Sequence, residues 1–464
     1  MERRTFKPTS WVPLLCALCV NSLLASSALR TSAYSAPLRY LFLRFVLNHP
    51  LEAPFTSHRP QVTSSLHWPL VTYFSSLYFF SLLLVHYTYN FYSLRITAFI
   101  YVLSGESMAK KPSKTVTGRV LHDPVKDKLR PIFPLDLSKI KTIDDLVRAM
   151  GNTAYTARQV GDAADVLEAM ARDKDCFVVM TLSGALTVGK MGLVFCDLIE
   201  SGIVKAIVST GALMAHGLVE ATGLSHFRYD PSKMDDNELF RAGYNRVYDS
   251  LEPETNLDHV EEVVDAIFEK WDAEEVVCSW KLHHRIGEFL HKNTNGRGIL
   301  RSAYECNVPV FVPAFSDSEL GLDFALNKYG RQRDGRPVLR FDPFEDFEKF
   351  TNTMLATKKM GIFTIGGGVP RNWSQQFGVY AELMARRGYK KLPLKRYHYG
   401  VRICPEPVHW GGLSGSTYTE AVSWGKFVPR EEGGRFAEVL EDATVALPLV
   451  VGAVLERLKY FKNQ

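Results

Sequence analysis

Cys176-Phe177-Val178-Val179-Met180-Thr181 is a run of apolar or β-branched residues without a charged side chain. An apolar run of this length predicts a strand buried on both faces of a sheet. The loop Leu182-Ser183-Gly184-Ala185 follows, and then a helical pattern runs to about Glu200. The run therefore indicates the first strand of an α/β core.

The same strand-to-helix pattern recurs along the chain. Strands are predicted at 203–209, 308–313 and 361–365, and helices at 210–223, 258–273 and 372–387. Alternating strands and helices predict a mostly parallel sheet with helices on both faces. We expect a Rossmann-like α/β core within a single catalytic domain spanning residues 108–464.

In such sheets ligands bind beyond the carboxyl ends of the strands. The loops that follow the predicted strands are Ser183-Gly184, Thr210-Gly211-Ala212, Ala314-Phe315-Ser316-Asp317 and Gly366-Gly367-Gly368. Glycines ahead of a helix let backbone N–H groups approach a phosphate, although a triple glycine is also a common tight turn. The spacing is not G-x-G-x-x-G, because Arg371 stands where the last glycine would fall.

Single polar residues in these loops have two interpretations each. Asp317 either holds a ribose hydroxyl or caps the following helix. Arg371 either adds charge to the site or is a solvated surface arginine. His216 is expected to be a hydrogen-bonded histidine of its helix rather than a ligand.

Near the C-terminus, Glu420-Ala421-Val422-Ser423-Trp424-Gly425-Lys426 places three reactive groups close together. A carboxylate can hold a cationic amine, and an indole face can cover it. A lysine that loses its proton can attack a carbon–nitrogen double bond. These residue types indicate amine chemistry through a lysine imine.

This heptapeptide resembles the active-site signature of the deoxyhypusine synthase family. The resemblance implies NAD-dependent transfer of an aminobutyl group from a polyamine such as spermidine to an acceptor amine. It implies that Lys426 forms the imine, that Glu420 binds the substrate amine and that Trp424 lines the polyamine channel. It also implies a homotetramer whose subunits share their sites.

The resemblance extends over about residues 130–455. Residues 313–321 are similar to the family's Pro-Ala-x-Thr-Asp-Gly-Ser-x-Gly loop. The cofactor-binding residues expected from this resemblance and from the loops above are Ser183, Gly184, Thr210, Gly211, Ala212, Asp317, Gly366, Gly367, Gly368, Ser414, Asp442 and Ala443.

The substrate-binding positions depart from the eukaryotic pattern. Leu413 stands where an Asp is expected, Asn372 stands where a His is expected, and Asp323 is displaced by one position. Ala215 and His216 replace a pair of glutamates. We expect Asn372 and Asp323 to contact substrate. The resemblance to the bacterial deoxyhypusine synthase-like branch implies a small amine as the acceptor, as in homospermidine synthesis. An enzyme for a different amine and a non-catalytic nucleotide-binding protein remain as alternatives.

Residues 1–107 differ in composition from the remainder. They contain eight Lys and Arg but three Asp and Glu, which accounts for the whole net charge of +5. Two apolar stretches, 11–29 and 69–103, are compatible with a signal peptide or a membrane anchor. We favour the interpretation that Met108 is the initiator and that the preceding residues are translated upstream sequence. The charge balance of 108–464 predicts neither nucleic-acid nor membrane binding.

The cysteines indicate a reducing compartment. Residues 108–464 contain five cysteines without close pairs. Cys16 and Cys19 form an isolated C-x-x-C inside an apolar run, which is not a zinc or redox pattern. We therefore expect a cytoplasmic enzyme without a metal.

Overall fold

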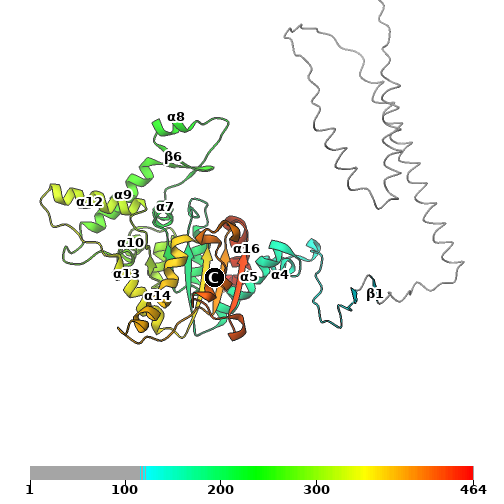
Figure 1. Ribbon diagram of the computed structural model, residues 1–464. Coiled ribbons are helices and arrows are strands. Elements are labelled where there is room, and N and C mark those ends of the chain that lie inside the picture. Colours follow the sequence, from blue (N-terminus) through cyan, green and yellow to red (C-terminus); the bar gives the residue numbers. More distant parts are fainter. Residues whose placement is uncertain (1–114, 117–118, 121, 463–464) are drawn as a thin grey trace, which may run out of the picture. The chain divides into compact units, whose positions relative to one another are not determined.

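The computed structural model describes residues 115–116, 119–120 and 122–462 (Figure 1). The chain divides into two units, Met1–Leu121 and His122–Gln464. In the first unit, β1 (Thr115–Val116) and β2 (Arg119–Val120) pair antiparallel. The expectations stated for residues 1–107 lie outside the described residues.

The second unit is built on a six-stranded sheet in the order β11-β10-β9-β3-β4-β8. Every neighbouring pair in this sheet is parallel. Counted along the chain from the β8 edge, the order is 3-2-1-4-5-6, which is the order of doubly wound dinucleotide-binding sheets. The predicted parallel α/β sheet is confirmed. Its strands are β3 (Cys176–Leu182), β4 (Ala206–Ser209), β8 (Val310–Phe311), β9 (Lys359–Ile365), β10 (Tyr399–Ile403) and β11 (Arg435–Val439).

Both faces of the sheet are covered, as predicted. Val178 and Met180 of β3 belong to one buried apolar cluster, and Val179 between them belongs to the other. Because neighbouring side chains of a strand point to opposite faces, the sheet has a core on each side. Figure 1 shows α5 (Tyr155–Arg172) and α16 (Ala443–Arg457) on one side, and α13 (Pro343–Ala356) and α14 (Gly368–Arg386) on the other.

The remaining elements surround this core. A three-stranded antiparallel sheet in the order β5-β7-β6 lies between α7 and α9 along the chain. Within the described residues, every helix falls short of the length and apolarity needed to cross a bilayer. The other elements are η1 (Leu137–Lys139), α4 (Ile143–Gly151), α6 (Gly192–Glu200), α7 (Gly211–Ala221), β5 (Phe227–Arg228), α8 (Asp236–Arg241), β6 (Tyr244–Val247), β7 (Ser250–Pro253), α9 (Glu254–Phe268), α10 (Ser279–Asn293), α11 (Ile299–Glu305), α12 (Glu319–Arg333), η2 (Val408–Trp410), η3 (Leu413–Gly415), α15 (Tyr418–Ser423), η4 (Arg430–Glu432) and η5 (Tyr460–Lys462).

Several predicted boundaries are wrong for local reasons. The helix after β3 begins only at Gly192, because Gly184 and Lys190 have φ of 80° and 64° and turn the chain before it. The strand predicted at 308–313 is reduced to β8, since Pro309 and Pro313 lack the N–H groups that a ladder requires. The strand at 203–209 shortens to β4, and the helix at 258–273 is α9.

Candidate active site

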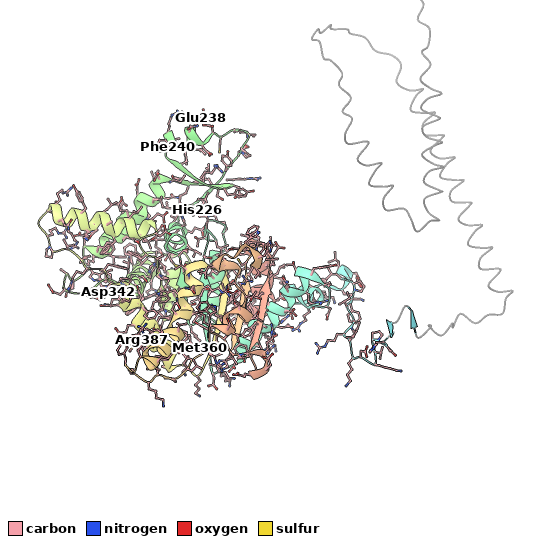
Figure 2. All side chains as sticks on the ribbon, viewed as in Figure 1. His226, Glu238, Phe240, Asp342, Met360 and Arg387 are labelled. Atoms are coloured by element: carbon pink, nitrogen blue, oxygen red, sulfur yellow. The ribbon has the colours of Figure 1, made fainter. Side chains whose placement is uncertain are left out.

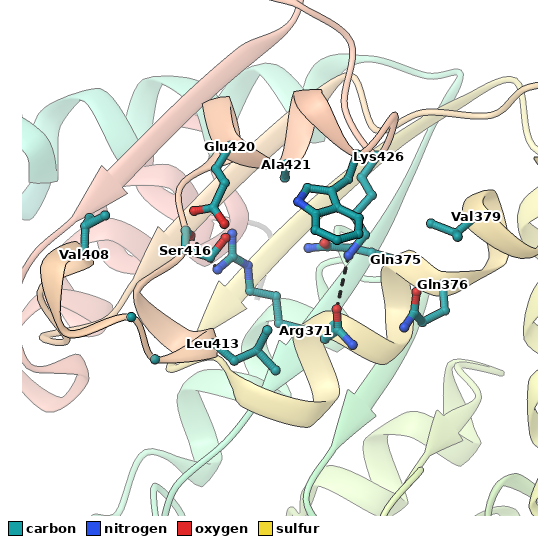
Figure 3. A pocket seen from close by; sticks show the side chains of 14 residues that line it. Arg371, Gln375, Gln376, Val379, Val408, Leu413, Ser416, Glu420, Ala421 and Lys426 are labelled. Carbon is teal, nitrogen blue, oxygen red and sulfur yellow. Dashed lines mark hydrogen bonds between the residues drawn. The ribbon is translucent and has the colours of Figure 1, made fainter.

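A cavity of about 520 Å³ brings most of the predicted substrate residues together. Glu420, Trp424 and Lys426 line one wall, and Asn372 lies on α14 opposite them. Figure 3 shows Glu420 and Lys426 projecting into the same space, with Arg371 and Gln375 reaching it from α14. Residues separated by about fifty positions in the chain therefore meet in a single cavity.

Local sequence explains how the heptapeptide presents its side chains. Thr417 caps the short helix α15 by accepting a hydrogen bond from the Glu420 amide. Tyr418 and Ala421 are buried and fix the helix against the core, so Glu420 and Trp424 face outward. Gly425, at φ of 66°, then turns the chain in a left-handed conformation that suits glycine.

The surroundings of the Lys426 side chain favour its neutral amine over its ammonium form. Burial lowers the pKa of Lys426, and the positive charge of Arg371 lowers it further, while Glu420 opposes both. Its Nζ donates to Asn372 Oδ1 at 3.1 Å and lies 5.7 Å from the centre of the Trp424 ring. A lysine with a lowered pKa has a larger neutral fraction near neutral pH, and only the neutral amine is a nucleophile.

Arg371 is buried at 3% exposure, so its interpretation as a solvated arginine is wrong. The guanidinium donates to the Ser416 carbonyl at 2.7 Å and lies 5.1 Å from the Tyr418 ring centre. Its Nε has no hydrogen-bond partner among the described residues. Arg371 is thus a fixed positive charge in the wall of the cavity.

The predicted cofactor residues all follow strands at the carboxyl edge of the sheet. Ser183 and Gly184 follow β3, and the other loops and helix starts follow β4, β8, β9, β10 and β11. In order along the chain they are Ser183, Gly184, Thr210, Gly211, Ala212, Asp317, Gly366, Gly367, Gly368, Ser414, Asp442 and Ala443.

Direct contacts join the loops on either side of the switch point between β3 and β9. The Gly367 amide donates to Ser183 Oγ at 2.8 Å. A Cβ on Gly367 would lie 2.5 Å from Ser414 Cα, and one on Gly366 would collide with Ser183 Oγ. The glycines at 366 and 367 therefore allow three loops to meet where doubly wound sheets bind nucleotides.

Asp317 and Asp442, the acidic residues predicted at this edge, differ in whether the carboxylate already accepts a hydrogen bond. Asp317 is exposed, and the cap of α12 is Ser318 instead, so the capping interpretation of Asp317 is wrong. Asp442 caps α16 by accepting from the Thr444 amide at 2.8 Å.

Thr210 Oγ1 is buried without a hydrogen-bond partner among the described residues, which leaves a polar group free to meet a ligand.

Asp323 does not line this cavity. It is buried on α12, where burial and the neighbouring acids Glu261, Asp265 and Glu319 raise its pKa to about 7. Its Oδ2 has no hydrogen-bond partner within the described part of the chain. A carboxyl group in this state gains a partner when a cationic amine approaches it.

Sequence reasoning missed Gln375 and the burial of Arg371. The side chains of Arg371 and Gln375 line the cavity from successive turns of α14. The i, i+4 spacing from Arg371 to Gln375 places the two side chains on one helix face, and this was the available signal. Gln375 Nε2 is buried without a hydrogen-bond partner among the described residues, so this wall retains an unused donor.

Comparison with known proteins gives a consistent result. The sequence model of the deoxyhypusine synthase family, described as "Deoxyhypusine synthase", matches residues 145–454. The chain is 31% identical over 335 residues to "Probable deoxyhypusine synthase 2" of Methanosarcina mazei, covering 72% of this chain and 92% of that protein. It is 33% identical over 324 residues to the "Deoxyhypusine synthase-like protein" of Chlorobaculum parvum, covering 69% and 88%. The protein of the same name from Elusimicrobium minutum is 32% identical over 330 residues, covering 70% and 84%.

Proposed function

Because the chain belongs to the deoxyhypusine synthase family, we propose that it is an NAD-dependent transferase that moves an aminobutyl group from a polyamine to an acceptor amine. The transfer proceeds through an imine on Lys426. Spermidine is the proposed donor, and a small amine that yields homospermidine is a proposed acceptor. The proposed location is the cytoplasm.

The observation that carries this proposal is the environment of the Lys426 amine. Its pKa is lowered by burial and by Arg371, and no ion pair joins it to Glu420 among the described residues. Glu420 therefore retains a free carboxylate for the substrate ammonium. The cavity combines a nucleophilic amine with an anion that holds a second amine.

The residues at the carboxyl edge of the sheet are suited to NAD. The uncapped start of α14 at Gly368, the unpartnered Thr210 Oγ1 and the exposed Asp317 offer backbone N–H groups, a hydroxyl and a carboxylate. These groups match the pyrophosphate and ribose of a dinucleotide. When bound, NAD supplies a hydride acceptor for the donor carbon beside nitrogen, and its reduced form returns the hydride to the product.

The residues of the cavity then carry the group transfer. Lys426 Nζ bonds to the oxidised carbon of the donor, and the bond from that carbon to the donor nitrogen breaks. The departing diamine takes the proton that Nζ gives up. The acceptor amine next bonds to the same carbon and releases Lys426. Asn372 orients Nζ by accepting its hydrogen bond, and Trp424 shields the reacting amine.

A different amine donor is the second candidate. Among the described lining residues, Glu420 is the sole carboxylate, and Leu413 adds an apolar surface. A polyamine with two distant ammonium groups requires a second anion, whereas a monoamine with an apolar end fits these groups as they stand. The alternative substrate class therefore rests on Leu413 and on the missing second acid.

A homotetramer that shares sites between subunits supplies that second acid. Asp323 is buried on α12 outside the cavity of its own chain, and Leu322, Leu326 and Tyr329 are exposed on the same helix. An exposed apolar stripe favours a protein interface. In the proposed assembly, Asp323 of one subunit completes the donor site of another.

Borohydride trapping tests the proposed reaction. The full-length protein is incubated with NAD and labelled spermidine, reduced with borohydride and digested for mass spectrometry. We expect an aminobutyl adduct on Lys426 that depends on NAD. Lys426→Arg keeps the charge but cannot form the imine, so we expect trapping and turnover to fall at least about 1,000-fold.

Lys459→Arg, a surface lysine replacement, serves as the matched control and should trap as the unmodified protein does. If Lys426→Arg still transfers the aminobutyl group, the lysine imine is excluded. NAD-dependent oxidation of another amine without spermidine turnover would instead support the second candidate.

A further inference from the structure

A second cluster of functional side chains lies outside the Lys426 cavity. His216, His226 and Glu252 each direct a potential ligand atom to a common point, and these atoms lie within 4.8 Å of one another. His226 Nε2 is 3.3 Å from Glu252 Oε1, and His216 Nδ1 contacts the other carboxylate oxygen. Two imidazole nitrogens thus flank one carboxylate.

The atoms that face this point are buried and contact one another. The side chains of His226 and Glu252 are each 1% exposed. Apart from these contacts with one another, His216 Nδ1, His226 Nε2 and both Glu252 oxygens have no hydrogen-bond partner among the described residues. His216 therefore pairs with a buried carboxylate from a distant strand, which the sequence did not indicate. A group placed between the three side chains would satisfy them together.

The opposite nitrogen of each imidazole faces a carboxylate. His216 Nε2 lies 3.9 Å from Glu319 Oε1, and His226 Nδ1 lies 3.9 Å from Glu220 Oε1. Histidines that bind a metal commonly direct their second N–H to a carboxylate, which sets the tautomer and strengthens the ligand. Here a carboxylate stands on the far side of each ring at 3.9 Å, which is beyond direct hydrogen-bond distance.

We propose that His216, His226 and Glu252 form a zinc-binding site. Two histidines and one glutamate are a known ligand set for Zn²⁺ that leaves a fourth position open. Zn²⁺ bonds of about 2.0–2.2 Å place tetrahedral donor atoms roughly 3.3 Å apart, and the His226–Glu252 separation already has this value. His216 is the most exposed of the three, at 12%, and marks the open side.

Lys190 is the one cation that contacts the cluster among the described residues. Its Nζ lies 3.0 Å from His226 Nδ1, and it also pairs with Glu220. Because an ammonium only donates, Nδ1 accepts this hydrogen bond and Nε2 carries the ring proton. Zinc binding at Nε2 therefore requires Lys190 to leave Nδ1, and its half-exposed side chain can do so while it keeps Glu220. The net charge of the surrounding acids, with Glu252, Glu220 and Glu319 against Lys190, favours a divalent cation.

The site would fasten a weakly packed segment to the core. His216 lies on α7, His226 directly precedes β5, and Glu252 lies on β7. The segment 222–253, which we call the excursion, contains α8 and the three-stranded sheet. Figure 2 shows His226 where the excursion meets the body, with Glu238 and Phe240 at its far end.

The excursion has little apolar core of its own. Its buried hydrophobic side chains are Leu239 and Leu251. Small segments with so few buried apolar groups commonly rely on a metal or a disulfide. Zinc between α7 and the two ends of the excursion would therefore hold the excursion to the body.

Zinc titration of the full-length protein tests the site. The protein is stripped with a chelator and titrated with Zn²⁺ against a chromophoric competitor. We expect the unmodified protein to bind at least one Zn²⁺ per chain. In Glu252→Gln and in His226→Asn, the affinity for one of these ions should fall at least about 100-fold or be lost. Glu319→Gln removes only a supporting carboxylate and should weaken binding of that ion roughly 10-fold.

His259 and Glu262 provide the matched control. They form an exposed histidine–glutamate pair at 3.5 Å on α9, and the His259→Asn/Glu262→Gln variant should bind zinc as the unmodified protein does. Equal zinc affinity in all variants, or no equivalent that depends on Glu252, would show that the cluster holds only hydrogen bonds and would overturn the proposal.

Two measurements on the unmodified protein remain decisive if a variant fails to fold. Zn²⁺ should raise the melting temperature relative to the chelator-treated protein, since a ligand that binds only the folded state stabilises it. Co²⁺ in the site should give the visible spectrum of a four-coordinate nitrogen–oxygen site. A spectrum limited to thiolate bands, or an unchanged melting temperature, contradicts zinc binding by this cluster.

Discussion

At the scale of single residues, the reactivity of Lys426 depends on which charges face its amine. Arg371 and burial lower the pKa of Lys426, whereas Glu420 raises it. The neutral hydrogen-bond acceptor at 3.1 Å is Asn372, whose amide carries no charge. An amide at this position orients the amine without stabilising the ammonium as a carboxylate would.

Asn372→Asp should therefore make Lys426 more basic. A carboxylate within hydrogen-bond distance favours the ammonium and raises its pKa. Because the neutral amine is the nucleophile, activity rises as pH rises through the Lys426 pKa, and in the variant this rise should move upward by about one pH unit. The pH dependence of borohydride-trapped adduct measures the shift.

Gln376→Glu is the control for added charge. Gln376 lines the same cavity from α14 but makes no hydrogen bond with Lys426 among the described residues (Figure 3). The same amide-to-acid change there should move the pH profile less. Equal shifts in the two variants would mean that general charge in the cavity, rather than the Asn372 contact, sets the Lys426 pKa.

At the scale of elements, α14 connects the cofactor edge to the substrate cavity. Its N-terminal cap is Gly367, and its first turns carry Arg371 and Asn372 into the cavity. The approach of Ser414 to Gly367 keeps η3 against the start of this helix. A displacement of the glycine loop 366–368 would therefore change both the proposed NAD site and the substrate cavity.

Gly367→Ala should lower stability and NAD affinity together. The added Cβ would lie 2.5 Å from Ser414 Cα and 2.7 Å from Ser414 Cβ. Since a backbone atom is in the way, the two loops must separate, at a cost of about 1–3 kcal/mol in unfolding free energy. Chemical denaturation and NAD titration by fluorescence measure the two effects.

Gly330→Ala is the same substitution in open space. Gly330 lies within α12, and a Cβ there would have no neighbour within 4 Å. Alanine in a helix interior should raise the unfolding free energy by roughly 0.5–1 kcal/mol. A Gly367→Ala protein as stable as this control, with unchanged NAD affinity, would refute the role assigned to the crowded loop.

At the scale of the whole molecule, the proposed homotetramer depends on an interface formed by α12. Leu322, Leu326 and Tyr329 are exposed at i, i+4 and i+7, which places them along one side of the helix. Asp323 is the adjacent buried acid with a raised pKa. Asp323 lies on the adjoining buried face of α12 with Leu320, Asn327 and Arg331, and its Oδ2 lacks a hydrogen-bond partner within the described chain.

Leu326→Glu should dissociate the assembly and reduce activity with it. A charge buried in an apolar interface is strongly unfavourable, so sedimentation should show a smaller native mass, and turnover should fall at least about 10-fold. Tyr389→Glu replaces an exposed aromatic residue on a different segment and should change neither. A fully active monomer of Leu326→Glu would exclude shared sites.

Much of the fold could be predicted because its strands are locally distinctive. Residues 178–181 of the run 176–181 are buried on both faces, and the lack of polar alternation in the run already indicates this. Boundaries were predicted less well. Pro309 and Pro313 shorten β8, and the positive φ of Gly184 and Lys190 delays α6, because backbone geometry at single residues overrides apolar periodicity.

The placement of the candidate site could be predicted only in part. The heptapeptide 420–426 supplied Glu420, Trp424 and Lys426 because all three lie in one short segment. Asn372 was expected from a resemblance, and it does meet Lys426. Asp323 was expected by the same reasoning, yet the structure places it outside the cavity of its own chain.

The sequence by itself determined the parallel sheet, the loops at its carboxyl edge and the chemical groups available for amine chemistry, because each depends on a short, contiguous pattern. Only the tertiary structure decided that Arg371 is buried beside Lys426 and that His216, His226 and Glu252 converge. These outcomes depend on contacts between distant segments, and the burial and charge that those contacts create are set by packing rather than by local periodicity.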